Sequence, residues 1–118
     1  MKHHNEGEYY EAHEAWEELW LAESDDARRL FLQGLIQVTS AFHKVFFQKE
    51  LGGAGRLLAR GLSKLEPLPG DFEGVALGPF RDGARRCCEA ISKLPPTKEG
   101  AALFDAALVP RLAWSEPR

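Results

Sequence analysis

The stretch from Asp26 to Lys49 constrains the fold more than any other part of this chain, because it is long, apolar and helical in its periodicity. Its apolar residues recur three and four positions apart and cover one broad face. They are Leu30, Phe31, Leu35, Val38, Phe42, Val45 and Phe46. A helix with so wide an apolar face needs neighbours on several sides, so we expect it at the centre of a bundle. Polar side chains within it, such as Gln37 and Lys44, indicate a core helix rather than a membrane span.

Turn and capping signals divide the rest of the sequence into further helices. Together with the central segment, the expected helices span residues 5–22, 26–49, 54–65 and 79–94. Asn5 can cap the first helix, with Glu8 as its capping-box partner. Gly52-Gly53 is expected to separate the second helix from the third, and Gly78-Pro79 to start the fourth. Within the third helix, Gly61 would allow a neighbouring helix to approach closely.

The chain as a whole has the size and composition of one globular domain. It has 118 residues, of which 44% are hydrophobic and 28% are charged, and these are ordinary values for a globular protein. We therefore predict a single all-α domain over residues 1–118, an irregular bundle of four to five helices with the long second helix at its centre. The tail from 97 to 118 contains apolar side chains, so we expect it to pack back onto the bundle.

Charge and cysteine usage narrow the class of protein. The formal net charge of −3 gives no support for nucleic-acid binding. The first residues lack the apolar segment that a signal peptide needs. Cys87 and Cys88 are neighbours, and adjacent cysteines rarely form a disulfide with each other. We therefore expect inert free thiols, with Cys87 in the core, and a cytoplasmic protein.

The segment before the central helix carries the clearest sign of a site. His13 and Glu17 are one helical turn apart, so their side chains lie on one face of the first predicted helix. Three aromatic residues share that face, namely Tyr9, Trp16 and Trp20. An imidazole and a carboxylate in an apolar stripe are costly to bury unless they are paired or bound to something. The pair therefore marks a candidate site, whereas His3 and His4 are interpreted as a polar terminus.

The central helix supplies partners for this pair if the first two helices form an antiparallel hairpin. With the turn near residue 25, Gln33 lies opposite Glu17 and Gln37 lies opposite His13. His43 would lie about one turn beyond His13 and share the same cleft. The candidate binding residues are therefore Tyr9, His13, Trp16, Glu17, Trp20, Gln33, Gln37 and His43.

Three functions remain open for these residues. The first is a pocket between the two helices that binds a ligand or a group of a partner, with the aromatic side chains as its walls. The second is a metal-dependent hydrolase in which His13, Glu17 and His43 hold a divalent metal and Glu14 acts as a base. The third is a polar network that fixes helix packing in a domain acting through protein contacts, for example as a homodimer.

The metal alternative rests on a comparison with the HExxH helix of zinc hydrolases, in which two histidines one turn apart bind the metal. Here His13-Glu14 matches the first half of that motif, but Glu17 stands where the second histidine would be. A histidine and a carboxylate at this spacing still offer two ligands, and a third has to come from elsewhere. The helix also turns Glu14 by about 100° from His13, which weakens its case as a base.

An ordered set of short motifs runs through the first part of the chain. The motifs are Tyr9-Tyr10-Glu11-Ala12-His13-Glu14, Glu17-Glu18-Leu19-Trp20, Phe31-Leu32-Gln33-Gly34-Leu35-Ile36-Gln37, His43 and Gly53-Ala54-Gly55-Arg56-Leu57-Leu58. Their order and content resemble the family called domain of unknown function 309, over about the first two-thirds of the chain. The resemblance implies a small all-α fold. It implies no catalytic activity, substrate or cofactor.

The positions that match the family's motif coincide with those selected by helix geometry, with two additions. They are His13, Glu14, Glu17, Trp20, Gln33, Gly34, Gln37 and His43. Of the additions, Gly34 has a physical explanation, because a position without a side chain would let the first helix approach the second closely. Beyond Leu65 no segment matches a motif of the family, so the cysteines and the tail gain no functional interpretation.

Overall fold

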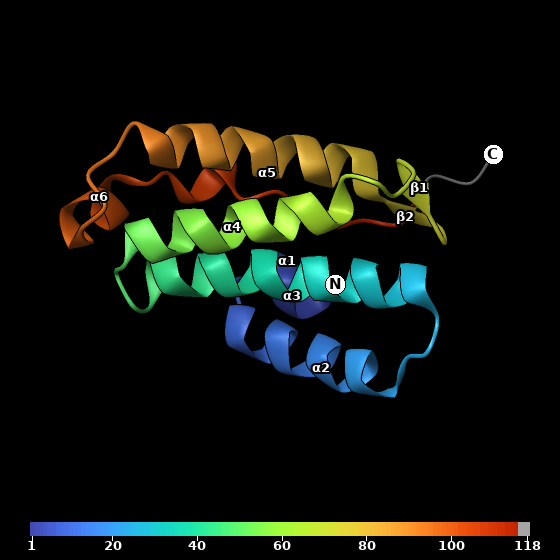
Figure 1. Cartoon of the computed structure of the whole chain (residues 1–118). Helices are drawn as coiled ribbons and strands as arrows, with labels where there is room; N and C mark the ends of the chain where they lie inside the picture. Colours follow the sequence, from blue (N-terminus) through green and yellow to red (C-terminus); the bar gives the residue numbers. More distant parts are fainter. Residues whose placement is uncertain (116–118) are drawn as a thin grey trace.

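Four long helices lie side by side in the computed structural model of the protein, which describes residues 1–115 (Figure 1). In chain order the elements are α1 (Lys2–Asn5), α2 (Tyr9–Ala22), α3 (Asp26–Phe46), α4 (Leu51–Leu65), β1 (Asp71–Phe72), β2 (Val75–Ala76), α5 (Leu77–Ser92), α6 (Lys98–Leu103) and the 3₁₀ turn η1 (Ala106–Leu108). The predicted all-α fold class is confirmed. None of the helices in residues 1–115 combines the length and the apolar character needed to cross a membrane.

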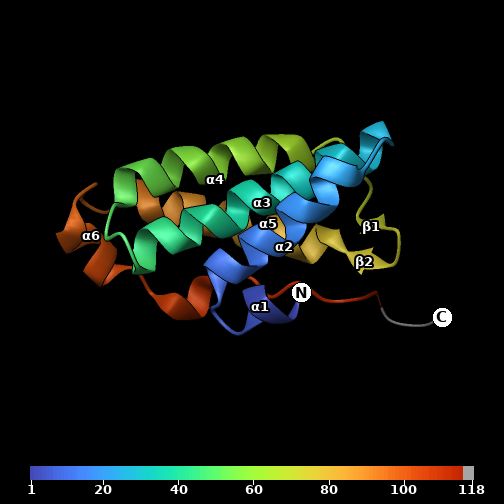
Figure 2. The same ribbon diagram turned by 90° about the horizontal axis from the view of Figure 1, so that it is seen from below.

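The central position of α3 follows from its broad apolar face. In Figure 1, α3 lies between α2 and α4, and α5 lies on the far side of α4. Leu35, Val38, Phe42 and Val45 of α3 are at most 1% exposed, so its apolar side chains form the middle of the core. Figure 2 shows α1 and the C-terminal segment next to each other, below the long helices in that view.

Two glycines allow α3 and α4 to pack closely. A Cβ atom at Gly34 would lie 2.7 Å from Cγ of Leu65, and one at Gly61 would lie 2.9 Å from the carbonyl oxygen of Gly34. The prediction for Gly61 therefore agrees with the structure. The prediction for Gly34 was wrong in its partner: this glycine faces α4, not the first long helix, since its Cβ position lies against Leu65 and Gly61.

A buried histidine holds α1 in place. The His4 side chain is 1% exposed, and its ring lies among Tyr9, Phe42 and Phe80 with centroid separations of 5.5–6.1 Å. Its Nε2 lies 2.9 Å from the carbonyl oxygen of Pro110, and its Nδ1 lies 3.2 Å from Oγ1 of Thr39. The interpretation of His4 as part of a polar terminus was therefore wrong, because both ring nitrogens find partners inside the fold.

The first long helix begins later than the predicted span of 5–22. Gly7 has φ +79° and separates the short helix α1 from α2, which begins at Tyr9. Asn5 does not cap this helix. Its side chain donates to the carbonyl oxygen of Leu112 over 2.7 Å and accepts from the Leu112 amide over 2.8 Å. The tertiary contact with the C-terminal segment thus outweighs the local capping preference of asparagine.

The boundary between the second and third long helices also differs from the prediction. α3 ends at Phe46 instead of 49, and α4 begins at Leu51 instead of 54. Gly52-Gly53 therefore lies in the first turn of α4, where backbone amides have no intrahelical partner and glycine disrupts little. The Gly52 amide donates to the carbonyl oxygen of Pro96 over 3.1 Å, and Leu51 is completely buried, so tertiary contacts fix this start.

α5 spans Leu77–Ser92, whereas the prediction was 79–94. Gly78-Pro79 lies inside its first turn, which tolerates proline because the missing amide would have no partner there. The preceding hairpin of β1 and β2 was not predicted. Its two turn residues, Glu73 and Gly74, have φ values of 50° and 83°, the left-handed backbone that tight hairpins need.

The C-terminal segment lies against this hairpin and against α1. Trp114 forms an antiparallel bridge with Val75, and Leu112 is 2% exposed. The predicted tail spans 97–118, and its last three positions, 116–118, lie outside the described residues. Between 97 and 115 the tail contains α6 and η1, and Phe104 reaches the core beside Phe42.

Candidate functional site

The side chains of His13 and Glu17 pair with each other at the edge of α2 that faces α3. Nε2 of His13 lies 3.2 Å from Oε2 of Glu17, and Nδ1 lies 3.6 Å from Oε1 of Glu14. The side chains of His13 and Glu17 are 29% and 43% exposed. The pair is therefore accessible from solvent, and the premise that it is buried in the apolar stripe does not hold.

Two adjoining cavities lie between α2 and α3, and His13 lines both of them. The first, which we call the His43 cavity, has a volume of about 200 Å³ and is lined by Tyr10, His13, Ser40, His43, Lys44 and Gln48. The second, which we call the Gln33 cavity, has a volume of about 150 Å³ and is lined by His13, Glu17, Trp20, Gln33, Ile36 and Gln37. We refer to the two together as the α2–α3 groove.

Six of the eight candidate residues line this groove, namely His13, Glu17, Trp20, Gln33, Gln37 and His43. The expectation that Tyr9 and Trp16 form its walls does not match their positions. Tyr9 is 7% exposed and Trp16 is 8% exposed, and the rings of both lie beside the buried His4. The rotation of α2 about its axis explains the difference, since it turns these two rings toward the core and leaves Tyr10 beside the groove.

Further residues line the groove besides the candidate site residues. Counting further outward from the same turn predicts that Tyr10 to Glu6 face Ser40 to Lys44, and Tyr10, Ser40 and Lys44 are among the lining residues. Gln48 lies beyond the end of α3 at Phe46, and no sequence signal marks it.

Aromatic contacts hold the ring of His43. Phe47 stacks on it with a centroid separation of 5.2 Å, and Tyr10 lies 5.8 Å away on a tilted plane. Nδ1 of His43 is buried and has no hydrogen-bond partner among residues 1–115. Buried polar atoms in native proteins nearly always have a hydrogen-bond partner, so Nδ1 of His43 is an exception to this rule.

Two lysines bind the side-chain amides of the groove. Nζ of Lys64, on α4, donates to Oε1 of Gln37 over 2.8 Å. Nζ of Lys44 donates to Oε1 of Gln48 over 3.3 Å and also lies 3.6 Å from Oε2 of Glu50. In both amides the oxygen therefore has a partner, and the amide hydrogens remain to be donated.

A cation–π contact involves Trp20, one of the residues that line the Gln33 cavity. The guanidinium carbon of Arg29 lies 4.5 Å from the centre of the Trp20 ring. Arg29 also donates to the carbonyl oxygens of Trp20 and Glu23, over 3.0 Å and 2.8 Å. These bonds satisfy carbonyl groups at the C-terminal end of α2 and fix Trp20 as the wall of the cavity.

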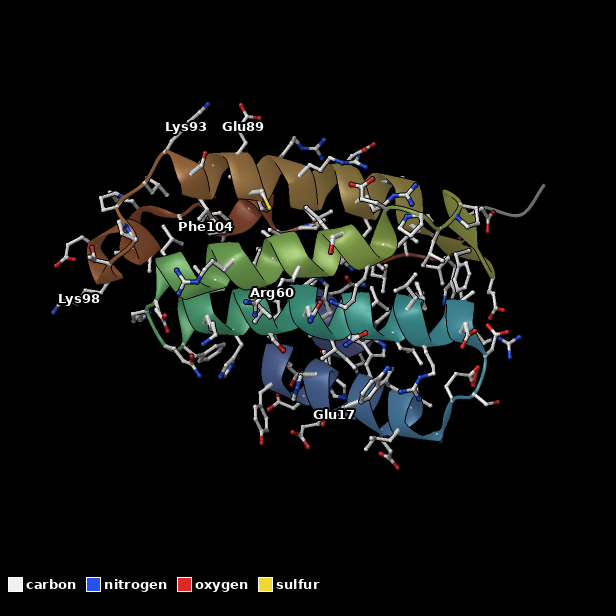
Figure 3. All side chains as sticks on the ribbon, in the orientation of Figure 1. Glu17, Arg60, Glu89, Lys93, Lys98 and Phe104 are labelled. Carbon is white, nitrogen blue, oxygen red and sulfur yellow. The ribbon has the colours of Figure 1, made fainter. Side chains whose placement is uncertain are left out.

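Figure 3 shows Glu17 on α2 and Arg60 on α4, with α3 between the two helices.

One group of side chains in residues 1–115 brings three cation ligands together. The ligand atoms of His13, Glu14 and Glu17 lie within 4.8 Å of one another. His43, the third ligand in the sequence-based metal hypothesis, is not a member of this group. Imidazole nitrogen and carboxylate oxygen suit first-row divalent metals, so the donor chemistry fits such an ion. All three ligands come from a single helix and are partly exposed.

The fold and the groove define a small all-α protein with a polar, solvent-accessible cleft between its first two long helices. Residues 1–57 match the model of a family described as domain of unknown function (DUF309). The match confirms the resemblance to that family over this segment, which is just under half of the chain. Among curated proteins and among solved structures, the comparisons find no match.

The matched segment contains every candidate site residue, together with α1, α2 and α3. It is shorter than the two-thirds of the chain over which the motifs were compared. It also contains His4, whose burial is the main structural feature of α1. The family's description specifies no activity, so the function has to be argued from the groove itself.

Proposed function

We propose that this protein is a binding domain that holds a small polar molecule, or a polar group of a partner, in the α2–α3 groove. The observation that carries the proposal is the pair of adjoining cavities that share His13. Polar contacts would come from His13, Glu17, Gln33, Gln37 and His43. Tyr10 and Trp20 form the walls in this proposal, while Tyr9 and Trp16 support the groove from the core.

The exposure of the groove residues supports a binding role over a purely structural one. A partly exposed histidine–glutamate pair such as His13–Glu17 contributes at most about 1 kcal/mol to stability. The buried polar network of the fold is formed by His4, Thr39 and Pro110, away from the groove lining. Among residues 1–115, Gln37 is the polar groove residue that hydrogen-bonds to a side chain of another long helix, through Lys64 of α4. A binding role accounts for the gathering of the other polar side chains in one cleft.

The proposal can be tested by titrating isotope-labelled protein with small probes of four chemical classes and recording amide NMR shifts. The classes are organic cations, neutral amides, carboxylates and phosphates. We expect saturable shifts at residues of the groove for at least one class, and we expect His13→Ala to weaken them. His3→Ala is a matched control, because His3 also pairs with a glutamate, Glu8, at 3.0 Å, but lies outside the groove lining. If no class gives saturable shifts in the groove, the proposal fails.

A metal-dependent hydrolase is a second candidate, favoured by the clustering of His13, Glu14 and Glu17. A divalent metal held there would supply Lewis-acid chemistry to a bound substrate. The test is the metal content of untagged protein purified without chelator, measured by plasma mass spectrometry beside His13→Ala and Glu17→Ala. One first-row metal per chain, lost in both variants, would support this candidate. A protein that is metal-free and gains no thermal stability from added zinc, manganese or nickel would exclude it.

We further infer that the 118 residues form one domain, because α1 is joined to the C-terminal segment by the bonds of His4 and Asn5. A cytoplasmic location and a homodimer remain predictions from the sequence. Size-exclusion chromatography with light scattering would test the second of these.

A further inference from the structure

We propose that the His43 cavity is the anion-binding end of the α2–α3 groove, and that it takes the carboxylate or phosphate group of a small molecule. The inference rests on the proposed binding function and specifies the ligand's chemistry. It is carried by the hydrogen-bond donors among the lining side chains and by the bond that joins Lys44 to the amide of Gln48.

The lining of the His43 cavity consists of side chains that can donate hydrogen bonds. Tyr10 and Ser40 carry hydroxyl groups, Lys44 carries an ammonium group, and His13 and His43 carry imidazole rings. No aspartate or glutamate is among the six lining residues. A ligand that only accepts hydrogen bonds matches such a lining, and an oxyanion is the strongest acceptor among common ligand groups.

The orientation of Gln48 strengthens this polarity. Its Oε1 accepts a hydrogen bond from Lys44, and its NH₂ group supplies two further donors. Gln37, in the adjoining cavity, is oriented in the same way by Lys64. In both amides a lysine occupies one of the two lone pairs of the oxygen, while the two N–H donors of the NH₂ group remain for a ligand.

Three glutamates lie next to the lining of the cavity. Glu50 lies 3.6 Å from Lys44, and Glu14 and Glu17 lie 3.6 Å and 3.2 Å from the ring nitrogens of His13. Their side chains are 43–57% exposed, and partly exposed pairs of this kind are worth at most about 1 kcal/mol, so a bound anion can compete for the ammonium group of Lys44. Glu17 lines the Gln33 cavity instead, which makes that end unfavourable for a second anion.

The walls of the cavity limit the size of the group that it accepts. A volume of about 200 Å³ is below the range of about 300–1,000 Å³ for sites that enclose whole drug-sized ligands. A carboxylate or phosphate group with a short stem fits this space. The stacked ring of Phe47 holds His43 in a fixed orientation, so its imidazole is already positioned for a ligand that enters.

The test is an NMR titration of the labelled full chain with inorganic phosphate, with acetate and with ethanolamine, at constant ionic strength set by chloride. We expect phosphate or acetate to cause saturable shifts at Ser40, His43, Lys44 and Gln48, and ethanolamine to cause none there. Binding of only one of the two anions identifies the group as phosphate or as carboxylate. Absence of saturable shifts with both anions would overturn the inference.

A pair of matched variants tests the role of the ammonium group. Lys44→Gln should weaken anion binding by about tenfold or more, because it removes a charged hydrogen-bond donor. Lys98→Gln removes the same charge from the exposed start of α6 and should change the affinity by less than about twofold. Equal effects of the two variants would show a nonspecific charge effect and contradict the inference.

The outcome also separates this inference from the proposed function. If a cation or a neutral amide binds the groove and neither anion does, the groove is a binding site but its anion-binding end is disproved. If no probe of any class binds, both proposals fail together. Correct folding of each variant is checked by the dispersion of its amide spectrum, so loss of binding cannot be confused with loss of the fold.

Discussion

Nε2 of His4 donates a hydrogen bond to the carbonyl oxygen of Pro110 over 2.9 Å, across 106 positions of sequence. Because Nε2 carries the proton, Nδ1 of the neutral ring accepts from the hydroxyl group of Thr39 at 3.2 Å. One imidazole therefore joins α1, α3 and the C-terminal segment. Burial lowers the pKa of His4 from 6.5 to about 4. The bond to Pro110 opposes this shift, and the charges of the N-terminal amine and Arg111 add to it.

The shift of this pKa predicts a loss of stability in mild acid. The unfolded chain binds a proton at His4 near pH 6.5, whereas the folded protein binds it only near pH 4. The contribution of His4 is therefore complete above about pH 6.5 and falls by about 3 kcal/mol as the pH approaches 4. Denaturant unfolding at about pH 7, 5.5 and 4 measures this loss. His4→Gln has no imidazole to titrate and should show a shallower pH dependence, so an unchanged slope would contradict the prediction.

His4→Ala and His13→Ala should lower the free energy of unfolding by different amounts. His4→Ala removes a buried ring and leaves the Pro110 carbonyl and the Thr39 hydroxyl without their partner, so we expect the free energy of unfolding to fall by about 2–4 kcal/mol. His13→Ala removes only a partly exposed ion pair and should cost less than about 1 kcal/mol. Chemical denaturation of both variants at neutral pH provides the comparison. Equal losses would mean that His13 belongs to a structural network after all.

The sequence was sufficient to predict the parts of the fold that depend on local periodicity. The apolar face of 26–49 predicted a central helix, and α3 has that position. Helix starts were less predictable, because contacts between distant segments decide them. Asn5 has the side chain of a helix cap, but it binds the backbone of Leu112 instead. No local pattern contains that information.

The candidate site was also predictable where it depends on local spacing, and not where it depends on contacts between distant segments. Counting outward from the turn placed Gln33 and Gln37 near Glu17 and His13, and all four line the groove. The burial of Tyr9 and Trp16 could not be read from spacing, because it depends on how far α2 rotates toward α1. His4 has no motif around it. Its role arises from a cage of aromatic rings contributed by three separate helices, including Tyr9 and Phe80.

Gly34→Ala should destabilise the protein, although alanine is normally the better helix former. In an open helix this change stabilises by about 1 kcal/mol. Here the new Cβ would lie 2.7 Å from Cγ of Leu65 and 3.2 Å from the carbonyl oxygen of Gly61, so α3 and α4 must move apart. We expect a net loss of about 1–3 kcal/mol, as for other overpacked cores. Thermal unfolding gives the sign directly, and a higher melting temperature would show that the contact between the helices can relax.

Thiol labelling should distinguish the two adjacent cysteines. Burial raises the pKa of Cys87 to about 12, and its Sγ donates to the carbonyl oxygen of Leu108 over 3.2 Å. At about pH 8 its thiolate fraction is therefore only about one in ten thousand. Cys88 is only partly buried, although burial also raises its pKa. With a chromogenic disulfide reagent, native Cys87→Ser should react slowly and native Cys88→Ser should not react until denaturant is added. Fast labelling of native Cys88→Ser would mean that α5 and the C-terminal segment separate readily in solution.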